Sequence, residues 1–253
     1  MKKIISSILT ALFIGGCCCG CCNLSQCKTE LGKGYTLATT PASEFYATNW
    51  RKFWGPRYLE KVKFTYENAD KIDIVFVGDS ITHFWDTTGK EVAAEKFPNH
   101  TILNLGFSGD RTQQTIWTTS QKEIWSKINP KLITLMIGTN NIGWSKSDAA
   151  STLAGTKIIL DNLRKNAPNA KILLFAIFPR GKDATDKFRP QIDIVNKALP
   201  QFADGENIIF VNINDKLINA DGTISKEMMP DFLHPAKQGY AIWADAINQY
   251  INW

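Results

Sequence analysis

Two short polar motifs near opposite ends of the chain contain the residue types of a serine hydrolase. The sequence Gly-Asp-Ser at residues 78–80 follows an apolar run, and Asp-Phe-Leu-His at residues 231–234 lies close to the C-terminus. A serine nucleophile, a histidine base and an acid that orients the histidine can cleave esters when the fold brings them together. We predict Ser80 as the nucleophile, His234 as the base, and Asp231 as the group that holds the imidazole Nδ1 and leaves Nε2 for the serine proton.

Each of these residues also has a purely structural interpretation. An aspartate–serine pair at a turn is a favoured helix N-cap, so Ser80 could simply begin a helix. Asp231 could likewise cap the final helix, which would leave His234 as a surface residue. Of the other two histidines, His100 is expected in a surface turn before a strand. His83 is expected on the helical side of the nucleophile, in a structural or rim position.

Acyl transfer also requires N–H donors for the negative charge that develops on the carbonyl oxygen. Two further motifs offer them: Gly-Phe-Ser-Gly at residues 106–109 and Gly-Thr-Asn-Asn at residues 138–141. Gly109 has no side chain to block its own amide, and Asn140 carries an NH₂ donor. We predict that these two groups and the backbone N–H of Ser80 form an oxyanion hole. A turn glycine and a turn asparagine are the alternatives when each residue is taken singly.

The elements that must position these motifs alternate along the chain. The predicted strands are apolar on both faces: Ile72–Val77, Thr101–Leu105, Leu132–Ile137, Lys171–Phe178 and Ile208–Ile213. The predicted helices between and after them are Lys90–Phe97, Thr112–Lys127, Ser147–Asn166, Arg189–Ala203 and Pro235–Tyr250, and residues 50–66 are expected to add one or two more. Buried strands alternating with helices predict an α/β fold, a three-layer α/β/α sandwich with a five-stranded parallel, flavodoxin-like sheet. Ligands bind such sheets beyond the carboxyl ends of the strands, where the predicted site residues fall.

Bulk composition narrows the class of protein. The chain has 253 residues, of which 44% are hydrophobic and 21% are charged, which is typical of a globular protein with one α/β domain, here placed at residues 46–253. The net charge of +5 is spread among interspersed acidic and basic residues, so a nucleic-acid partner is not expected. All six cysteines lie at or before Cys27, which excludes disulfides and thiolate chemistry from that domain. We predict no metal and no organic cofactor.

The N-terminus has the pattern of an export signal. A short basic start and a mostly apolar stretch too short to span a bilayer are followed by Ile-Gly-Gly-Cys at residues 14–17, which resembles a bacterial lipobox. The resemblance implies a signal peptide at residues 1–16, a lipid on Cys17, and an exported protein anchored to a membrane. Residues 17–45 are then the lipidated cysteine and a flexible tether. An ordinary secretory signal cleaved at one of the glycines is the alternative.

The four motifs together resemble the blocks of the SGNH/GDSL hydrolase superfamily, over about residues 72–250. The resemblance implies a nucleophile at Ser80, oxyanion donors at Gly109 and Asn140, and the histidine and acid already named. Phe-Pro-Arg-Gly at residues 178–181 and Gly-Tyr at residues 239–240 resemble the platelet-activating-factor acetylhydrolase-like branch, whose bacterial members look like acetylesterases, often of acetylated sugars. Phe232 departs from the family, where glycine is common, and is expected to narrow the pocket beside the histidine.

Four residues near predicted strand ends are expected to line the substrate pocket: Trp85, Phe107, Trp144 and Arg180. The alternative is that the aromatic residues belong to the core or the rim. We predict a serine esterase for a short acyl group, most simply acetyl on a small molecule or glycan. A lysophospholipase or thioesterase with the same machinery, and a catalytically idle carbohydrate-binding lipoprotein, are the alternatives. The oligomeric state is left open.

Overall fold

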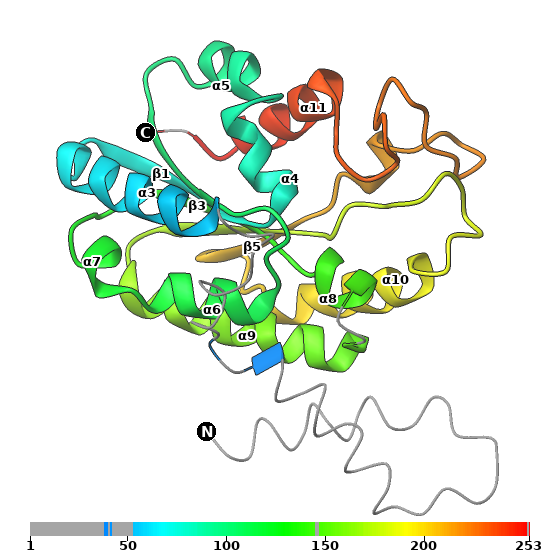
Figure 1. The fold of residues 1–253 in the computed structure, drawn as a ribbon, viewed down its shortest axis with the longest axis horizontal. Helices are drawn as coiled ribbons and strands as arrows, with labels where there is room; N and C mark the ends of the chain where they lie inside the picture. Colours follow the sequence, from blue (N-terminus) through cyan, green and yellow to red (C-terminus); the bar gives the residue numbers. More distant parts are fainter. Residues whose placement is uncertain (1–37, 40, 42–52, 145–146, 252) are drawn as a thin grey trace, which may run out of the picture. The chain divides into compact units, whose positions relative to one another are not determined.

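The protein is described by a computed structural model that covers residues 38–39, 41, 53–144, 147–251 and 253. Its centre is a five-stranded sheet in the order β2-β1-β3-β4-β5 (Figure 1). Every neighbouring pair of strands is parallel. The strands are β1 (Ile72–Gly78), β2 (Thr101–Gly106), β3 (Leu132–Met136), β4 (Lys171–Phe175) and β5 (Ile208–Val211). The predicted parallel, flavodoxin-like sheet is confirmed.

Helices cover both faces of the sheet. One face packs against α3 (Trp54–Asn68), α6 (Thr112–Ser120), α7 (Lys122–Trp125), α8 (Thr139–Trp144), α9 (Ala149–Asn166) and α10 (Arg189–Ala198). The other face packs against α4 (Ser80–His83), α5 (Lys90–Lys96) and α11 (Lys237–Asn248) (Figure 1). Short 3₁₀ turns complete the chain: η3 (Phe84–Asp86), η4 (Leu199–Phe202) and η5 (Asn214–Lys216). The three layers match the predicted sandwich.

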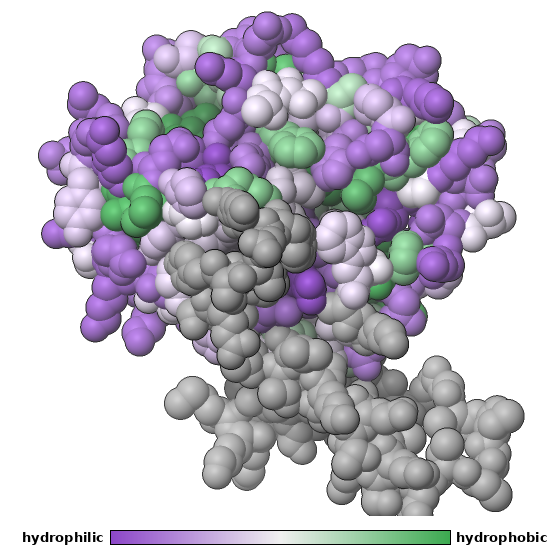
Figure 2. Space-filling view, viewed as in Figure 1, coloured by the Kyte–Doolittle hydropathy of each residue, from purple (hydrophilic) through white to green (hydrophobic). Residues whose placement is uncertain are grey.

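The strands are apolar throughout because each contributes to two hydrophobic cores. Side chains alternate across a strand, so Ile74 and Phe76 enter the core beneath α11 while Val75 and Val77 enter the core beneath α6 and α9. All four side chains are fully buried. The molecular surface is different: on the face shown in Figure 2, outside the grey atoms, hydrophilic residues dominate and apolar residues form separate patches.

Two predicted helices are each interrupted. The helix expected at 112–127 divides at Gln121, whose backbone is extended (ψ 112°), and the Trp125 indole Nε1 donates back to the Thr118 carbonyl at 3.0 Å. The helix expected at 189–203 ends at Ala198 and continues as the 3₁₀ turn η4, which contains Pro200. Proline lacks the N–H that an α-helical hydrogen bond requires, which accounts for the second change.

The N-terminal predictions fall largely outside the described residues. The signal peptide at 1–16, Cys17 and most of the tether at 17–45 belong to this part. Ala38 is described, and it is buried, with its carbonyl accepting a hydrogen bond from Thr112 Oγ1 at 2.8 Å. The packed domain therefore includes Ala38, which lies before the predicted boundary at residue 46. Among the described residues, no helix is both long enough and apolar enough to cross a bilayer.

Candidate active site

Three strands end at the same level and deliver the predicted motifs to one edge of the sheet. Gly78 at the end of β1 is in register with Gly106 of β2 and with Met136 of β3. The next residues along each chain segment are those of the Gly-Asp-Ser, Phe-Ser-Gly and Gly-Thr-Asn motifs. Parallel pairing therefore gathers at one sheet edge segments that are far apart in the sequence.

The structure brings Ser80, His234 and Asp231 into one hydrogen-bonded line. Ser80 Oγ lies 2.8 Å from His234 Nε2, and His234 Nδ1 lies 2.6 Å from Asp231 Oδ2. The other carboxylate oxygen of Asp231 accepts the backbone N–H groups of Leu233 and His234 at 3.0 and 2.8 Å. Because an ionised carboxylate can only accept, Nδ1 carries the proton and Nε2 is free to accept the serine hydroxyl.

The hydrogen bonds of Asp231 determine its charge. Burial alone would raise the pKa of this carboxyl, but the hydrogen bonds from the ring and backbone of His234 and from the backbone of Leu233 hold it below its ordinary value. Asp231 is therefore ionised at neutral pH. A negative charge beside Nδ1 stabilises the imidazolium that forms when His234 takes a proton.

Ser80 begins the short helix α4 and is nearly buried, with 7% of its surface exposed. Asp79 caps this helix, because its Oδ1 accepts the Ile81 N–H at 3.0 Å. The capping function considered for the sequence is therefore present, and it falls to Asp79 while the Ser80 hydroxyl faces His234. The Phe84 ring packs on the His234 imidazole with the ring centroids 4.9 Å apart.

The segment that contains Gly109 forms a tight turn, and we call residues 107–110 the oxyanion loop. Its first N–H, that of Phe107, donates to the Gly78 carbonyl at 3.1 Å, and the N–H of Asp110 returns to the Phe107 carbonyl at 3.0 Å. Gly109 adopts a φ of 76°, in the left-handed region that glycine enters without steric cost. The turn thus favours glycine at this position for its backbone.

Asn140 is linked directly to the oxyanion loop. Its Nδ2 donates to the Asp110 carbonyl at 2.9 Å, and its side chain is almost fully buried in α8. On the far side of the loop, the Trp54 indole donates to Asp110 Oδ1 at 2.8 Å. The structure therefore joins the two predicted oxyanion donors, Gly109 and Asn140, through Asp110.

Two of the predicted pocket residues are core residues instead. Trp85 is 2% exposed and packs edge-on against Tyr240, with centroids 4.7 Å apart. Phe107 is fully buried and stacks on Trp54 at 4.6 Å. Phe107 directly follows β2 and Trp85 lies in the 3₁₀ turn η3. The side chain of each turns into one of the two cores, and this side-chain direction corrects the pocket prediction.

The other two predicted pocket residues lie near α8. Arg180 Nη1 contacts the Thr139 carbonyl and hydroxyl oxygens at 3.3 and 3.2 Å, and its guanidinium stacks on Phe188. Trp144, four residues after Asn140 on α8, is 58% exposed. Positions four apart share a helix face, so this exposed indole lies on the Asn140 side of α8.

Phe232 stands where glycine is common in the family, and its backbone conformation is one that favours glycine. Its φ is 59°, and it is the only described non-glycine residue with a positive φ. Glycine adopts this conformation freely, whereas a bulky side chain is strained there. The Phe232 ring packs against the core beneath α11, and its carbonyl accepts the Gly181 N–H at 2.8 Å. The predicted narrowing of the pocket stays a prediction.

Sequence reasoning missed the contact of Phe84 with His234 and the raised pKa of the buried Asp79 carboxyl. The signal for Phe84 was its spacing, because residues four apart on a helical turn are neighbours. Burial raises the pKa of Asp79 to about 7, although the Ile81 N–H and the positive charge of Arg180 both oppose the shift. No sequence pattern distinguishes this buried carboxyl from an ordinary exposed cap. Among the described residues, no three His, Cys, Asp or Glu side chains group as a metal site.

Comparisons with known proteins identify the family of the chain. The model of the GDSL-like lipase/acylhydrolase family matches residues 76–242. Platelet-activating factor acetylhydrolase IB subunit alpha1 of Homo sapiens is 30% identical over 182 residues, which cover 70% of this chain and 75% of that protein.

Solved structures share the fold at lower sequence identity. A GDSL-like lipase from Bacteroides thetaiotaomicron superposes with a TM-score of 0.61 at 20% identity, covering 76% of this chain and 96% of that one. An acetyl xylan esterase, AlAXEase, superposes with a TM-score of 0.58 at 20% identity, covering 72% and 100%. The family match over residues 76–242 and the 30% identity to the acetylhydrolase subunit go beyond fold, and the chain belongs to the platelet-activating-factor acetylhydrolase-like branch of the SGNH/GDSL hydrolase superfamily, a family of ester hydrolases.

Proposed function

We propose that the protein is a serine esterase that removes short acyl groups, most simply acetyl, from carbohydrate esters through an acyl-serine intermediate. The observation that carries the proposal is the continuous relay from Ser80 Oγ to His234 Nε2 at 2.8 Å and from His234 Nδ1 to Asp231 at 2.6 Å. A serine hydroxyl is a weak nucleophile at neutral pH unless an adjacent base can remove its proton.

In the first half of the reaction, Ser80 Oγ attacks the ester carbonyl carbon while its proton passes to His234 Nε2. The π electrons of the carbonyl move to its oxygen, which the backbone N–H groups of Ser80 and Gly109 and the Asn140 amide would stabilise. The carbon–oxygen bond to the alcohol then breaks, and His234 returns the proton to the leaving oxygen. The products of this half are a free alcohol and an acyl-serine.

In the second half, water takes the place of the alcohol. It gives a proton to His234 Nε2 and attacks the acyl carbon, and Ser80 Oγ leaves as it regains the proton. A carboxylic acid is released and the enzyme returns to its starting state. Asp231 stays ionised throughout and stabilises the imidazolium in both halves, in keeping with its lowered pKa.

The acyl and alcohol parts of the substrate have separate support. The human relative is named an acetylhydrolase and one structural neighbour an acetyl xylan esterase, so acetyl is common to both names. The exposed indole of Trp144 on the Asn140 side of α8 offers a flat surface for a sugar ring. Arg180 supplies hydrogen-bond donors near Thr139 on the same helix. A few polar groups beside an aromatic side chain are typical of small-molecule sites.

The test is hydrolysis of p-nitrophenyl acetate, butyrate, octanoate and laurate by the purified protein and its Ser80→Ala variant. We expect the highest kcat/KM on the acetate. We expect Ser80→Ala to lower it by at least ~10³-fold, because the nucleophile and the base act as a unit. Acetylated xylo-oligosaccharides and phospholipid esters are then tested as natural substrates. Higher activity on the acetylated xylo-oligosaccharides than on the phospholipid esters would support the carbohydrate assignment.

Three outcomes would contradict the proposal at different levels. Highest activity on octanoate or laurate would replace the acetylesterase with a lysophospholipase or thioesterase, which uses the same residues on a longer chain. Equal activity of the wild type and Ser80→Ala would remove the serine mechanism altogether. A folded wild type that neither hydrolyses esters nor reacts with a fluorophosphonate would indicate the catalytically idle alternative.

A further inference from the structure

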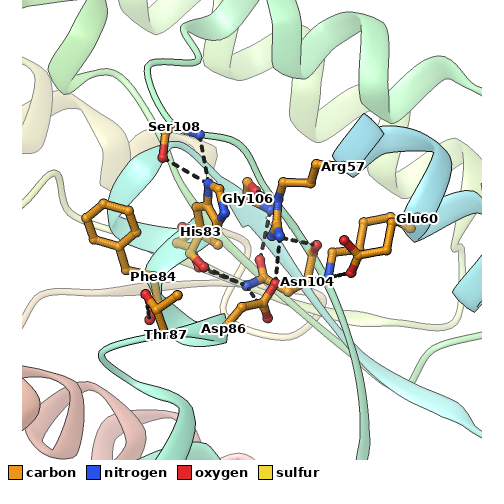
Figure 3. Close-up of polar contacts among 11 residues, drawn as sticks. Arg57, Glu60, His83, Phe84, Asp86, Thr87, Asn104, Gly106 and Ser108 are labelled. Atoms are coloured by element: carbon orange, nitrogen blue, oxygen red, sulfur yellow. Dashed lines mark hydrogen bonds and ion pairs between the residues drawn. The ribbon is translucent and has the colours of Figure 1, made fainter. Parts of the chain in front are cut away.

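His83 contacts the oxyanion loop although it is not part of the catalytic line. It ends α4, three residues after the nucleophile, so its side chain shares a helix face with Ser80. Its Nδ1 lies 3.3 Å from the backbone N of Ser108 and 2.9 Å from Ser108 Oγ (Figure 3). Ser108 directly precedes Gly109. One imidazole nitrogen therefore joins the nucleophile helix to the loop that presents the Gly109 amide.

The contact with the backbone fixes the tautomer of His83. A main-chain N–H can only donate, so Nδ1 must be the unprotonated nitrogen and Nε2 must carry the proton. Burial, and then the nearby positive charge of Arg57, lower the pKa of His83 to about 4, against the opposing effect of Asp86. The ring is consequently neutral at neutral pH and keeps its acceptor for Ser108.

A buried polar network holds the backbone of His83 in place. Asn104 Nδ2 lies within hydrogen-bond distance of the carbonyl oxygens of Thr82 and His83, at 3.1 and 3.3 Å, and of Asp86 Oδ1 at 3.0 Å (Figure 3). Asn104 Oδ1 accepts the Gly106 N–H at 2.9 Å. The end of α4 is thereby attached to β2, the strand that leads into the oxyanion loop.

Arg57, on α3, also belongs to this network. Its Nε donates to the Gly106 carbonyl at 2.8 Å, and its Nη1 pairs with Asp86 Oδ2 at 2.7 Å. The Arg57 side chain is 9% exposed, so its guanidinium is shielded from water, whereas the Asp86 carboxylate is 33% exposed. A satisfied buried network of this kind restricts the groups within it to one arrangement, and His83 is the member that reaches the loop.

The position of Ser108 matters because of the peptide that follows it. The Gly109 N–H belongs to the planar peptide between Ser108 and Gly109, so the direction of this N–H depends on the Ser108 backbone. At the other end of the turn, the Asp110 N–H is already bound to the Phe107 carbonyl. The contact with His83 adds a hold on the turn at Ser108.

We propose that His83 is a positioning residue: through Nδ1 it holds Ser108 and so directs the Gly109 N–H toward the developing oxyanion. The inference rests on the esterase function proposed above and adds a residue to it. His83 touches neither substrate nor reacting atoms in this scheme. Loss of its acceptor should therefore lower kcat and leave KM nearly unchanged.

The first test compares His83→Leu, which removes the acceptor, with His83→Asn, whose amide oxygen can occupy the place of Nδ1. With p-nitrophenyl acetate, we expect His83→Leu to lower kcat about ten- to a hundredfold, somewhat less than complete loss of one oxyanion donor. KM should stay within about twofold and His83→Asn should recover most of the loss. His100→Leu is the matched control, because His100 also binds through Nδ1, to Asp73 at 2.6 Å, but at the opposite end of the strands. It should leave kcat unchanged.

The second test measures amide hydrogen exchange in the peptide that spans the oxyanion loop and does not depend on ester hydrolysis. Exchange should be about tenfold faster in His83→Leu than in the wild type, and near the wild-type rate in His83→Asn. If His83→Leu does not fold, Ser108→Ala, which removes only the Oγ contact, replaces it. In that case His83→Ala, a smaller substitution that also removes the acceptor, and Ser108→Ala should be non-additive in kcat.

A folded His83→Leu with wild-type kcat and wild-type loop exchange would overturn the inference, and so would additive effects in the substitute cycle. A change in KM alone would also overturn it, because that points to substrate binding. If the wild type hydrolyses no ester, the proposed function fails, and the exchange measurement still decides whether His83 holds the loop.

Discussion

At the scale of single residues, the protonation of the carboxyl groups near Ser80 is set by burial as much as by hydrogen-bond partners. Asp79 is fully buried, and among the described residues its Oδ2 has no hydrogen-bond partner. Its neighbour in the sequence, Ser80, faces an ionised Asp231 through His234. The pKa values of these two aspartates shift in opposite directions. The pKa of Asp231 is lowered because its carboxylate accepts several hydrogen bonds, and that of Asp79 is raised because its carboxyl has lost its contact with water.

Asp79→Asn should therefore change how stability depends on pH. In the wild type, burial raises the folded-state pKa of Asp79 to about 7 from its ordinary value of 3.8. The folded state thus keeps a proton that the unfolded state has lost, and stability falls as the pH rises between these values. Asparagine preserves the cap to Ile81 and cannot ionise. The variant should gain stability relative to the wild type as the pH rises, by as much as ~4 kcal/mol.

Urea unfolding of both proteins at about pH 4 and about pH 8 would measure this difference. The wild type and Asp79→Asn must be compared at each pH, because the shifted pKa of His83 changes the pH dependence of stability in the opposite direction. Its pKa is lowered from 6.5 to about 4, so it contributes stability that is lost as the pH falls through this range. A stability difference between wild type and Asp79→Asn that does not vary with pH would contradict the assignment of a raised pKa.

At the scale of elements, the site depends on how closely α4 approaches β2. A Cβ added to Gly106 at the end of β2 would lie 2.4 Å from the His83 backbone nitrogen and 2.6 Å from the Thr82 carbonyl carbon. Backbone atoms of a helix cannot move aside as a flexible side chain can. Glycine at position 106 is thus a condition for the helix that carries Ser80 to lie against the strand that carries the oxyanion loop.

We expect Gly106→Ala to lower the free energy of unfolding by about 1–3 kcal/mol, as overpacking does in cores. It should also lower kcat, since α4 must shift away from β2. Gly205→Ala is the control: it has a positive φ of 78° and open space around it, so it should show backbone strain and unchanged kcat. Thermal unfolding and p-nitrophenyl acetate hydrolysis measure both quantities. If Gly106→Ala kept the wild-type unfolding free energy and kcat, the close contact between α4 and β2 would not be required.

At the scale of the whole molecule, one domain with two cores carries the site, and its attachment to a membrane is a separate question. We propose that the protein is exported and anchored through a lipid on Cys17, on the strength of its lipobox-like sequence. Each buried methylene of an acyl chain contributes about 0.8 kcal/mol to membrane binding, so the modification determines where the domain resides.

Cys17→Ala should therefore move the full-length protein from the membrane fraction to the soluble fraction of a bacterial host and abolish labelling by radioactive palmitate. Cys27→Ala, a substitution outside the lipobox, should change neither readout. Membrane-bound, labelled Cys17→Ala protein would show that another cysteine or another mode of attachment is responsible. Soluble, unlabelled wild type would favour an ordinary secretory signal.

The sequence by itself determined the alternating elements, the parallel sheet and the identity of the catalytic candidates, because these depend on local periodicity and on short motifs at strand ends. Only the tertiary structure decided which way the nearby side chains turn. Phe107, directly after β2, and Trp85, in η3, are buried in the two cores, while Trp144 remains exposed. The protonation of Asp79 and the contact of His83 with Ser108 were likewise decided by the tertiary structure. Burial and contacts between distant segments arise only when the layers pack, and no local pattern in the chain records them.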